Sequence, residues 1–177
     1  MATGDDSAPP SRERELVITR VFDAPRELVW KAFAESDRLA HWWGPKDFTM
    51  LVHALDFRPG GVFHYSMRSP DGQVMWGKFV YHDIQAPERM VFVNSFSDEA
   101  GNIIRAPFSL TWPLEVMNTV TFAEHEGKTT VTLRGGPINA TEEERTAYWN
   151  AQESMRQGFA GTFDQLAAYL TEVAKGM

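Results

Sequence analysis

Two adjacent tryptophans followed by a glycine and a proline constrain this chain more than any other feature of its sequence. The segment Ser36–Pro45 has the pattern of a short helix that ends where Gly44 permits a left-handed backbone and Pro45 prevents continuation. Two large rings at a helix end must cover something, and the chain holds six Trp, twelve Phe and four Tyr. Two interpretations follow: the aromatic side chains fill a solid core, or they line a cavity for an apolar ligand.

The composition is that of an ordinary globular domain and argues against several classes of function. With 177 residues, 43% of them hydrophobic and 23% charged, the chain can bury a sizeable core. Its net charge of -7 and pI of about 5.2 do not supply the basic face that nucleic acid requires. There is no cysteine for a thiol nucleophile or a disulfide, and no apolar run approaches the roughly 20 residues of a membrane span. We expect a cytoplasmic protein that neither binds nucleic acid nor inserts into a membrane.

The beginning of the chain differs in composition from the rest. Residues 1–13 are small and polar, contain prolines and show no hydrophobic periodicity. We therefore predict a disordered N-terminal tail over residues 1–13. Residues 14–177 are predicted to form a single domain.

Hydrophobic periodicity predicts one strand and two short helices in the first quarter of the chain. Alternating apolar residues indicate a strand over Glu15–Phe22. The period then becomes helical, and Asp23 is predicted to cap a helix whose first turn holds Pro25. Ser36 is predicted to cap the second short helix.

Strands and turns follow almost to residue 136. Turns rich in Gly, Pro, Asp and Asn separate six further predicted strands, and connections this short favour antiparallel pairing. Thr141 is predicted to cap the approach to a long C-terminal helix with one apolar stripe. The strands are expected at Phe48–Phe57, Gly61–Arg68, Gln73–Asp83, Arg89–Phe96, Glu115–Phe122 and Thr129–Arg134, and the stripe comprises Met155, Phe159, Phe163, Leu166, Leu170 and Val173.

The order of these elements is that of the helix-grip fold of the START-like and birch-pollen-allergen superfamily. The chain carries the motifs VITRVFDAPRELVWKAF, LAHWWGPKDF, LDFRPGG, MRSPDG, APERMVF and GFAGTFDQLAAYL. Through these motifs it resembles, between about Glu15 and Val173, homologues of the C-terminal domain of the activator of the heat-shock protein 90 ATPase, a branch of the SRPBCC group. The resemblance implies an α+β fold: a seven-stranded curved antiparallel sheet wraps around the long C-terminal helix, with two short helices after the first strand. It implies less about activity, because one scaffold can host unrelated functions.

One face of the predicted sheet is expected to meet the apolar stripe of the long helix. Strand alternation gives the aromatic and methionine residues of the two strands after Gly61 a common face. A strongly curved sheet closed by one helix leaves space, which the resembling superfamily generally keeps, so we favour a cavity over a filled core. The predicted ligand-binding residues are Trp42, Trp43, Phe63, Tyr65, Met67, Met75, Phe79, Tyr81, Trp112, Met155, Phe159 and Phe163.

Neither a catalytic residue nor a cofactor is assigned, and no metal site is predicted. His53, His64 and His82 lie on consecutive predicted strands, where they could in principle approach one another as metal ligands. Strand alternation nevertheless turns His64 and His82 to the outer face. A nucleophile elbow, a phosphate-binding loop and a zinc-protease motif are absent from the sequence.

The insert Asn102–Leu114 is longer than a tight hairpin needs and carries Phe108 and Trp112. It resembles a similar turn in a subgroup of the same homologues. The insert could be a lid with Trp112 dipping toward the cavity, or Trp112 could cap the edge of the sheet. The sequence leaves both interpretations open.

Two functions from different classes follow from this architecture. The preferred one is the binding of a small apolar or amphipathic molecule between sheet and helix. The alternative is a cyclase or hydrolase in which polar groups such as Tyr65, Tyr81, Asn94 or Asn118 polarise a carbonyl. Stimulation of a chaperone ATPase is a third, less favoured hypothesis, because the resemblance covers only the later domain of the eukaryotic activator. An exposed edge strand would allow a homodimer.

Overall fold

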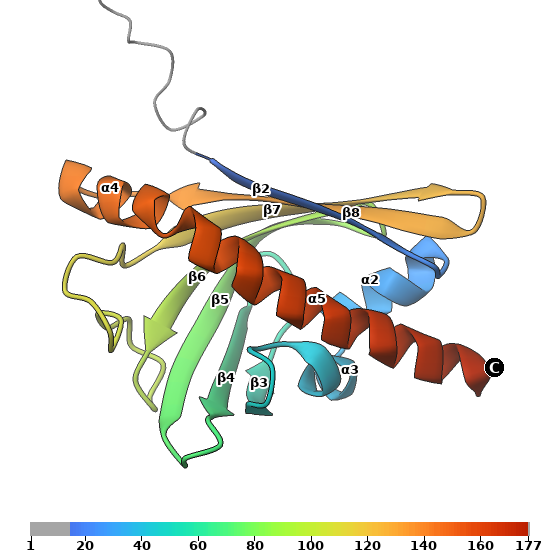
Figure 1. The fold of residues 1–177 in the computed structure, drawn as a ribbon, viewed down its shortest axis with the longest axis horizontal. Helices are drawn as coiled ribbons and strands as arrows, with labels where there is room; N and C mark the ends of the chain where they lie inside the picture. Colours follow the sequence, from blue (N-terminus) through green and yellow to red (C-terminus); the bar gives the residue numbers. More distant parts are fainter. Residues whose placement is uncertain (1–14, 177) are drawn as a thin grey trace, which may run out of the picture.

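The computed structural model describes residues 15–176, which form a curved antiparallel sheet around a long helix (Figure 1). The seven strands are ordered β2-β8-β7-β6-β5-β4-β3, and the predicted helix-grip fold is confirmed. The predicted tail over residues 1–13 lies outside the described residues. The elements are β2 Leu16–Phe22, α2 Arg26–Ala34, α3 Ser36–Trp42, β3 Thr49–Leu55, β4 Val62–Arg68, β5 Val74–Gln85, β6 Arg89–Ser97, β7 Val116–His125, β8 Lys128–Pro137, α4 Glu142–Asn150 and α5 Gln152–Lys175.

The predicted caps of the first two helices were wrong, whereas the third cap is confirmed. Pro25, not Asp23, is the N-cap of α2, and the backbone N–H of Arg26 donates to Glu124 Oε1 at 2.7 Å. Glu35 is the N-cap of α3, so Ser36 lies inside that helix. The Glu124 carboxylate thus binds a free N–H group at the start of α2 in place of a capping side chain. Thr141 caps α4 and forms a capping box with Glu144.

The last hairpin is tighter than the sequence pattern predicted. Strand β7 continues to His125 and β8 begins at Lys128, so only Glu126 and Gly127 form the turn. Both have positive φ, 53° and 79°, as a two-residue hairpin with right-handed strand twist requires. The polar residues before Gly127 therefore extend the strand rather than forming a longer loop.

The C-terminal helical region is divided in two. Ala151, with φ -91° and ψ 4°, separates α4 from α5, and the two helices meet at an angle (Figure 1). Phe163, Leu166 and Leu170 of the predicted stripe are buried against the sheet. Phe163 lies at the middle of α5 and the two leucines in its C-terminal half, whereas Met155 and Phe159, nearer the start of the helix, are only partly buried.

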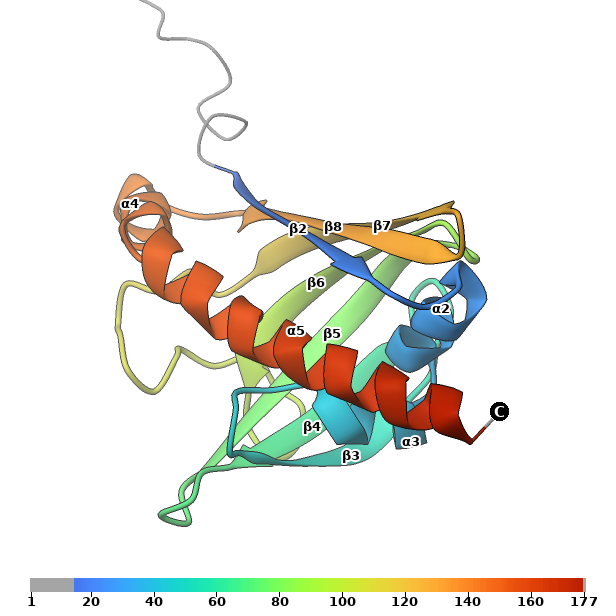
Figure 2. The ribbon, with the colours of Figure 1, turned by 45° about the vertical axis from the view of Figure 1, so that its right-hand side comes forward.

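Helices α2 and α3 fill one end of the groove between the sheet and α5. Both lie beside the C-terminal half of α5, away from the insert that precedes β7 (Figure 2). Trp30 packs edge-on against Phe122, and Phe33 packs against both Phe122 and Trp42. Buried aromatic side chains supply a large share of core energy because each removes a large apolar area from water. This end of the groove is a solid core.

The edge strands β2 and β3 are each modified in a way that interrupts further pairing. Arg156 of α5 donates to the Val17 carbonyl of β2 at 2.8 Å. On β3 the register shifts between Val52 and Ala54, as at a β-bulge. Both features are ways in which proteins protect sheet edges. The homodimer expected from an exposed edge stays a prediction.

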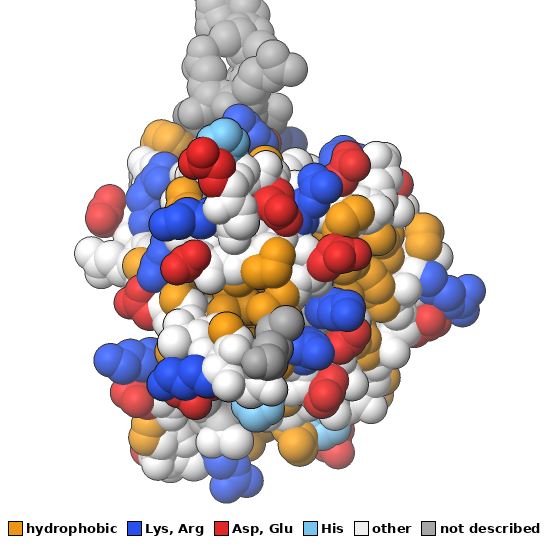
Figure 3. All heavy atoms as spheres, turned by 90° about the vertical axis from the view of Figure 1, so that its right-hand side faces the viewer, with side chains coloured by type: hydrophobic (Ala, Val, Ile, Leu, Met, Phe, Trp, Pro, Cys, Tyr) orange, Lys and Arg blue, Asp and Glu red, His pale blue; other side chains and the backbone are white. Residues whose placement is uncertain are grey.

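The surface at the C-terminal end of α5 mixes acidic and basic side chains around apolar patches (Figure 3). Interspersed charges of this kind give no strong field of a single sign. Within residues 15–176, we find no helix that combines the length and apolar character needed to cross a membrane.

One polar atom in the core has no partner. The Tyr81 hydroxyl is buried and forms no hydrogen bond within the described structure, while its ring packs between Phe57 and Phe79. Burial raises the pKa of the Tyr81 phenol, which keeps it neutral. By contrast, the hydroxyl of Tyr65, which pairs with Gly77 between β4 and β5, accepts a hydrogen bond from Asn94 Nδ2 at 3.2 Å.

Replacing Tyr81 by Phe is expected to raise the free energy of unfolding by about 1 kcal/mol, because it removes a buried hydroxyl with no partner. Tyr65→Phe is the matched control and should lower it by about 1 kcal/mol, since Asn94 then loses an acceptor. Urea denaturation of both variants measures the difference. A clear loss of stability in Tyr81→Phe would contradict the assignment of an unpaired hydroxyl.

Candidate functional site

A cavity of about 320 Å³ lies at the end of the groove that α2 and α3 do not fill. Strands β4 to β7 supply its floor, the N-terminal half of α5 and the turn after α3 supply one wall, and the insert and α4 supply the other. The lining is mostly apolar and consists of Trp43, Gly44, Pro45, Tyr65, Met67, Trp76, Gly77, Asn94, Ser95, Phe96, Phe108, Trp112, Pro113, Val116, Asn118, Tyr148, Met155, Gly158, Phe159 and Thr162.

The two adjacent tryptophans have different surroundings. Trp42, the last residue of α3, is 1% exposed and donates through Nε1 to the Ala32 carbonyl at 2.9 Å. Trp43 is already extended, with φ -72° and ψ 138°, so its ring is turned at 88° to that of Trp42. Trp42 therefore belongs to the solid core, and Trp43 reaches the cavity, where it contacts Phe159.

The turn after Trp43 is tied to α5 by side-chain hydrogen bonds. The Gly44 carbonyl accepts from Thr162 Oγ1 at 2.9 Å and from Gln165 Nε2 at 2.8 Å. Gly44 has φ +108°, a conformation that favours glycine, and a Cβ there would lie 3.3 Å from Met67 Sδ. These hydrogen bonds fix the distance between α5 and the turn that follows Trp43.

Tyr65 and Asn94 form a hydrogen-bonded pair on the floor of the cavity. Asn94 Nδ2 donates to the Tyr65 hydroxyl at 3.2 Å and to the Lys78 carbonyl at 3.1 Å. The Tyr65 ring lies directly over Gly77, where a Cβ would be 2.6 Å from the Tyr65 hydroxyl oxygen. Burial raises the pKa of Tyr65, and hydrogen bonds from Asn94 and Trp43 offset part of that rise. The phenol is therefore a neutral hydrogen-bonding group at neutral pH.

A second polar pair lies over another glycine. A Cβ at Gly135 would be 2.4 Å from Asn118 Oδ1 and 3.1 Å from the Tyr148 hydroxyl oxygen. Asn118 Nδ2 donates to the Val116 carbonyl at 3.5 Å, a long hydrogen bond that engages the amide weakly. Burial raises the pKa of Tyr148, with the nearby charge of Glu15 adding to it, so this phenol is also neutral.

The insert Asn102–Leu114 forms the outer wall of the cavity. Trp112 lines it and contacts Tyr148 of α4, with ring centroids 5.5 Å apart, and Phe108 packs against Trp112. Phe108 is nevertheless 64% exposed, and Leu110 at the tip is 85% exposed. Trp112 thus faces the cavity; whether the insert opens as a lid stays a prediction.

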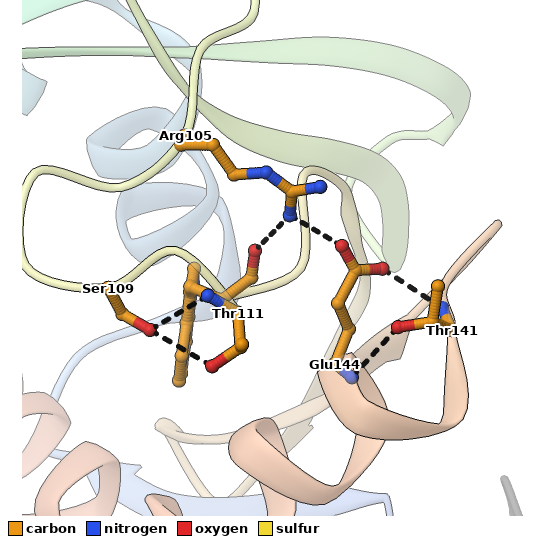
Figure 4. A network of polar contacts seen from close by, with 6 residues as sticks. Arg105, Ser109, Thr111, Thr141 and Glu144 are labelled. Carbon is orange, nitrogen blue, oxygen red and sulfur yellow. Dashed lines mark hydrogen bonds and ion pairs between the residues drawn. The ribbon is translucent and has the colours of Figure 1, made fainter.

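An ion pair anchors the insert to α4 (Figure 4). Arg105 Nη1 donates both to the Trp112 carbonyl at 3.0 Å and to Glu144 Oε2. The other carboxylate oxygen of Glu144 accepts from the Thr141 backbone N–H at 2.9 Å. These hydrogen bonds, that of Thr141 first and that of Arg105 next, lower the pKa of Glu144. One carboxylate thus joins the start of α4 to the insert.

The structure brings together part of the predicted ligand-binding set. Trp43, Tyr65, Met67, Trp112, Met155 and Phe159 line the cavity. Trp42, Phe63, Met75, Phe79, Tyr81 and Phe163 lie outside that lining and belong to, or pack against, the core cluster. Within this second group, Trp42 packs against Phe163 and Phe63 packs edge-on against Phe79. Strand parity cannot reveal such enclosure by other rings.

Several residues of the lining were not in the predicted set. Phe96 shares the inner face through its pairing with Gly77, so strand parity could have found it. Tyr148 and Gly158 come from α4 and α5, and their inward positions depend on the break at Ala151. Asn94 and Asn118 were named only as polar groups of the enzyme hypothesis.

The histidines do not belong to this site. His53 and His64 lie on the outer side of the sheet, where both rings pack against Trp76 and His53 Nε2 is 2.9 Å from Ser66 Oγ. His82 is exposed. Residues 15–176 contain no group of three or more His, Cys, Asp or Glu side chains arranged to hold a metal ion.

Comparison with known proteins identifies relatives of the whole domain. A family model described as Activator of Hsp90 ATPase homolog 1-like protein matches residues 23–171. Protein Ms6760 from Mycobacterium smegmatis is 27% identical, with a TM-score of 0.74 over 92% of this chain and 94% of that one. A protein from Arthrobacter aurescens is also 27% identical, with a TM-score of 0.76 over 92% and 88%. An AHSA1-like protein from Aeromonas hydrophila, 19% identical, shares the fold, with a TM-score of 0.62 over 89% and 94%. The comparison with curated proteins gave no match.

Gly77→Ala tests whether the space above Gly77 positions Tyr65. The added methyl would lie 2.6 Å from the Tyr65 hydroxyl oxygen, so the ring must shift, and we expect a loss of about 1–3 kcal/mol in unfolding free energy. Gly136→Ala is the matched control, because a Cβ there meets nothing within 4 Å, and it should stay within about 0.5 kcal/mol of the wild type. Equal stability of the two variants in denaturant titrations would contradict this role.

Glu144→Ala should loosen the insert, because it removes both the capping-box partner and the Arg105 anchor. We expect faster amide hydrogen exchange over residues 102–114 and a loss of about 1 kcal/mol in stability. Glu143→Ala, at an exposed position of the same turn, is the control. An exchange rate in Glu144→Ala equal to that in the control would refute the anchor.

The contact between Glu144 and Arg105 should also depend on pH. Because the folded-state pKa of Glu144 is lowered, the anchor is complete above the ordinary carboxyl pKa of about 4.3 and is lost as the pH falls through the lowered value.

Proposed function

The chain belongs to the family of Activator of Hsp90 ATPase homolog 1-like proteins, and from that premise and the cavity we propose that it binds a small apolar or amphipathic molecule. The observation that carries this proposal is a cavity of about 320 Å³ between a curved sheet and a helix, with a mostly apolar lining and a few buried polar groups. Cavities of ~300–1,000 Å³ with that chemistry are typical small-molecule sites.

Binding is supported over acid-base catalysis by the chemistry of the lining. Among the described residues that line the cavity there is no Asp, Glu, Lys, Arg or His. The titratable groups that do line it, the phenols of Tyr65 and Tyr148, have raised pKa values and stay protonated at neutral pH. General acid-base catalysis works best with a group whose pKa lies near the working pH. The cyclase or hydrolase alternative would therefore rely on hydrogen bonding alone.

Other aspects of the function are weaker proposals. Stimulation of a chaperone ATPase, suggested by the description of the family, is less favoured, and co-purification with the chaperone would support it. A cytoplasmic location and a homodimer are expectations from the sequence. The cavity itself is formed by one chain, so ligand binding needs no second copy.

Filling the cavity from the helix side tests the proposed function. Gly158 lies in the lining at the same helical stripe as Met155, Phe159 and Thr162, and a Cβ there meets nothing within 4 Å. In Gly158→Leu, the new side chain should lower the affinity for ligands by about tenfold or more. The fold should survive, because leucine favours a helix by about 0.5–1 kcal/mol over glycine.

The measurement is quenching of tryptophan fluorescence by a panel of long-chain alcohols, sterols and aromatic polyketides, since Trp43 and Trp112 line the cavity. Gly161→Leu is the control on the same helix, because Gly161 lies outside the lining. Wild-type quenching that is lost in Gly158→Leu and kept in Gly161→Leu supports the proposal. Silence across the whole panel, or equal quenching in both variants, would overturn it.

A further inference from the structure

The polar groups of the cavity are uncharged, and several of them lie on its floor. Tyr65 and Asn94 come from β4 and β6, and Asn118 comes from β7. The opposite wall presents apolar groups, among them Trp43 and Phe159. A molecule in the cavity therefore meets amide and phenol groups on one side and aromatic surface on the other.

Two glycines make room for these polar groups. A Cβ at Gly77 would be 2.6 Å from the Tyr65 hydroxyl, and a Cβ at Gly135 would be 2.4 Å from Asn118 Oδ1. Heavy atoms cannot approach so closely, so the sheet can carry Tyr65 and Asn118 in these positions only because residues 77 and 135 lack side chains. The polar floor therefore depends on the space above both Gly77 and Gly135.

The Tyr65 hydroxyl remains available to a ligand. Its oxygen accepts a hydrogen bond from Asn94 Nδ2 at 3.2 Å. A phenol that accepts hydrogen bonds still has its own hydrogen to donate. The group that this phenol suits is an acceptor, such as the oxygen of a carbonyl or a hydroxyl group.

The lining cannot neutralise an ionised ligand. It contains neither acidic nor basic side chains among the described residues. The guanidinium of the insert, Arg105, is engaged by Glu144 and by the Trp112 carbonyl. A charge that loses its water without a partner is strongly disfavoured, whereas a neutral group needs only its hydrogen bonds restored.

We propose that the cavity selects an uncharged molecule with an apolar body and a hydroxyl or carbonyl group that meets the Tyr65–Asn94 pair. This inference rests on the proposed binding function and narrows its ligand class. Ionised carboxylates, including fatty-acid anions, are disfavoured in the cavity, as are ammonium compounds.

Calorimetric titration with four naphthalene probes tests the selection by charge. The neutral probes are 2-naphthol and methyl 2-naphthoate, and the charged ones are 2-naphthoate and 2-naphthylmethylammonium. At neutral pH we expect each neutral probe to bind about tenfold or more tightly than either charged one. A charged probe that binds as tightly as the ester would overturn this inference while leaving the proposed function intact. Binding of none of the four would overturn both.

Reversal of the selection provides a second, independent readout. Met155→Lys places an ammonium group at the cavity wall and should raise the affinity for 2-naphthoate by about tenfold relative to the ester. Gln157→Lys adds the same charge at an exposed position of the same helix and should leave the ratio unchanged. An equal change of the ratio in both variants would assign the effect to overall charge and refute the inference.

The polar end of the ligand is tested by Asn94→Leu, which removes the amide that holds the Tyr65 hydroxyl. We expect the affinity for 2-naphthol to fall while that for unsubstituted naphthalene is kept. Asn150→Leu makes the same change at an exposed position of α4 and should alter neither affinity. If Asn94→Leu weakened naphthalene and 2-naphthol equally, the pair would have no role in recognising the hydroxyl group.

Discussion

The aromatic side chains that α2 and α3 place between the sheet and α5 determine where the cavity of this protein lies. Trp30, Phe33 and Trp42 fill one end of the groove, and the Trp42 indole is fixed by its hydrogen bond to the Ala32 carbonyl. Because the buried rings exclude water at that end, the cavity lies at the other end of the groove. The position of the cavity is thus a consequence of core packing.

The walls of the cavity are held by polar contacts rather than by close packing across it. On one side, Thr162 and Gln165 bind the Gly44 carbonyl and fix the turn that carries Trp43. On the other, Glu144 and Arg105 join α4 to the insert. Such contacts can keep two walls apart without filling the space between them. This arrangement explains how an apolar cavity persists beside a core with many aromatic contacts.

Sequence reasoning found the fold but only part of the candidate site. Strand parity correctly put Phe63, Tyr65 and Phe79 on the inner face. It could not distinguish Tyr65, which lines the cavity, from Phe63, which lies only in the core, because both positions have the same parity on the same strand. The cap assignments of α2 and α3 failed for a local reason: backbone geometry at Pro25 and Glu35 starts those helices without a side-chain cap.

The sequence by itself determined the order of the elements, the antiparallel meander and the apolar stripe of the last helix, because periodicity and turn residues are local properties. It also indicated that the rings of Trp42 and Trp43, at a helix end, must cover either other core residues or a ligand. Only the tertiary structure decided that one of these rings enters the core and the other the cavity, and that neutral polar groups meet above Gly77 and Gly135. Those outcomes depend on contacts between residues far apart in the chain, which no local pattern encodes.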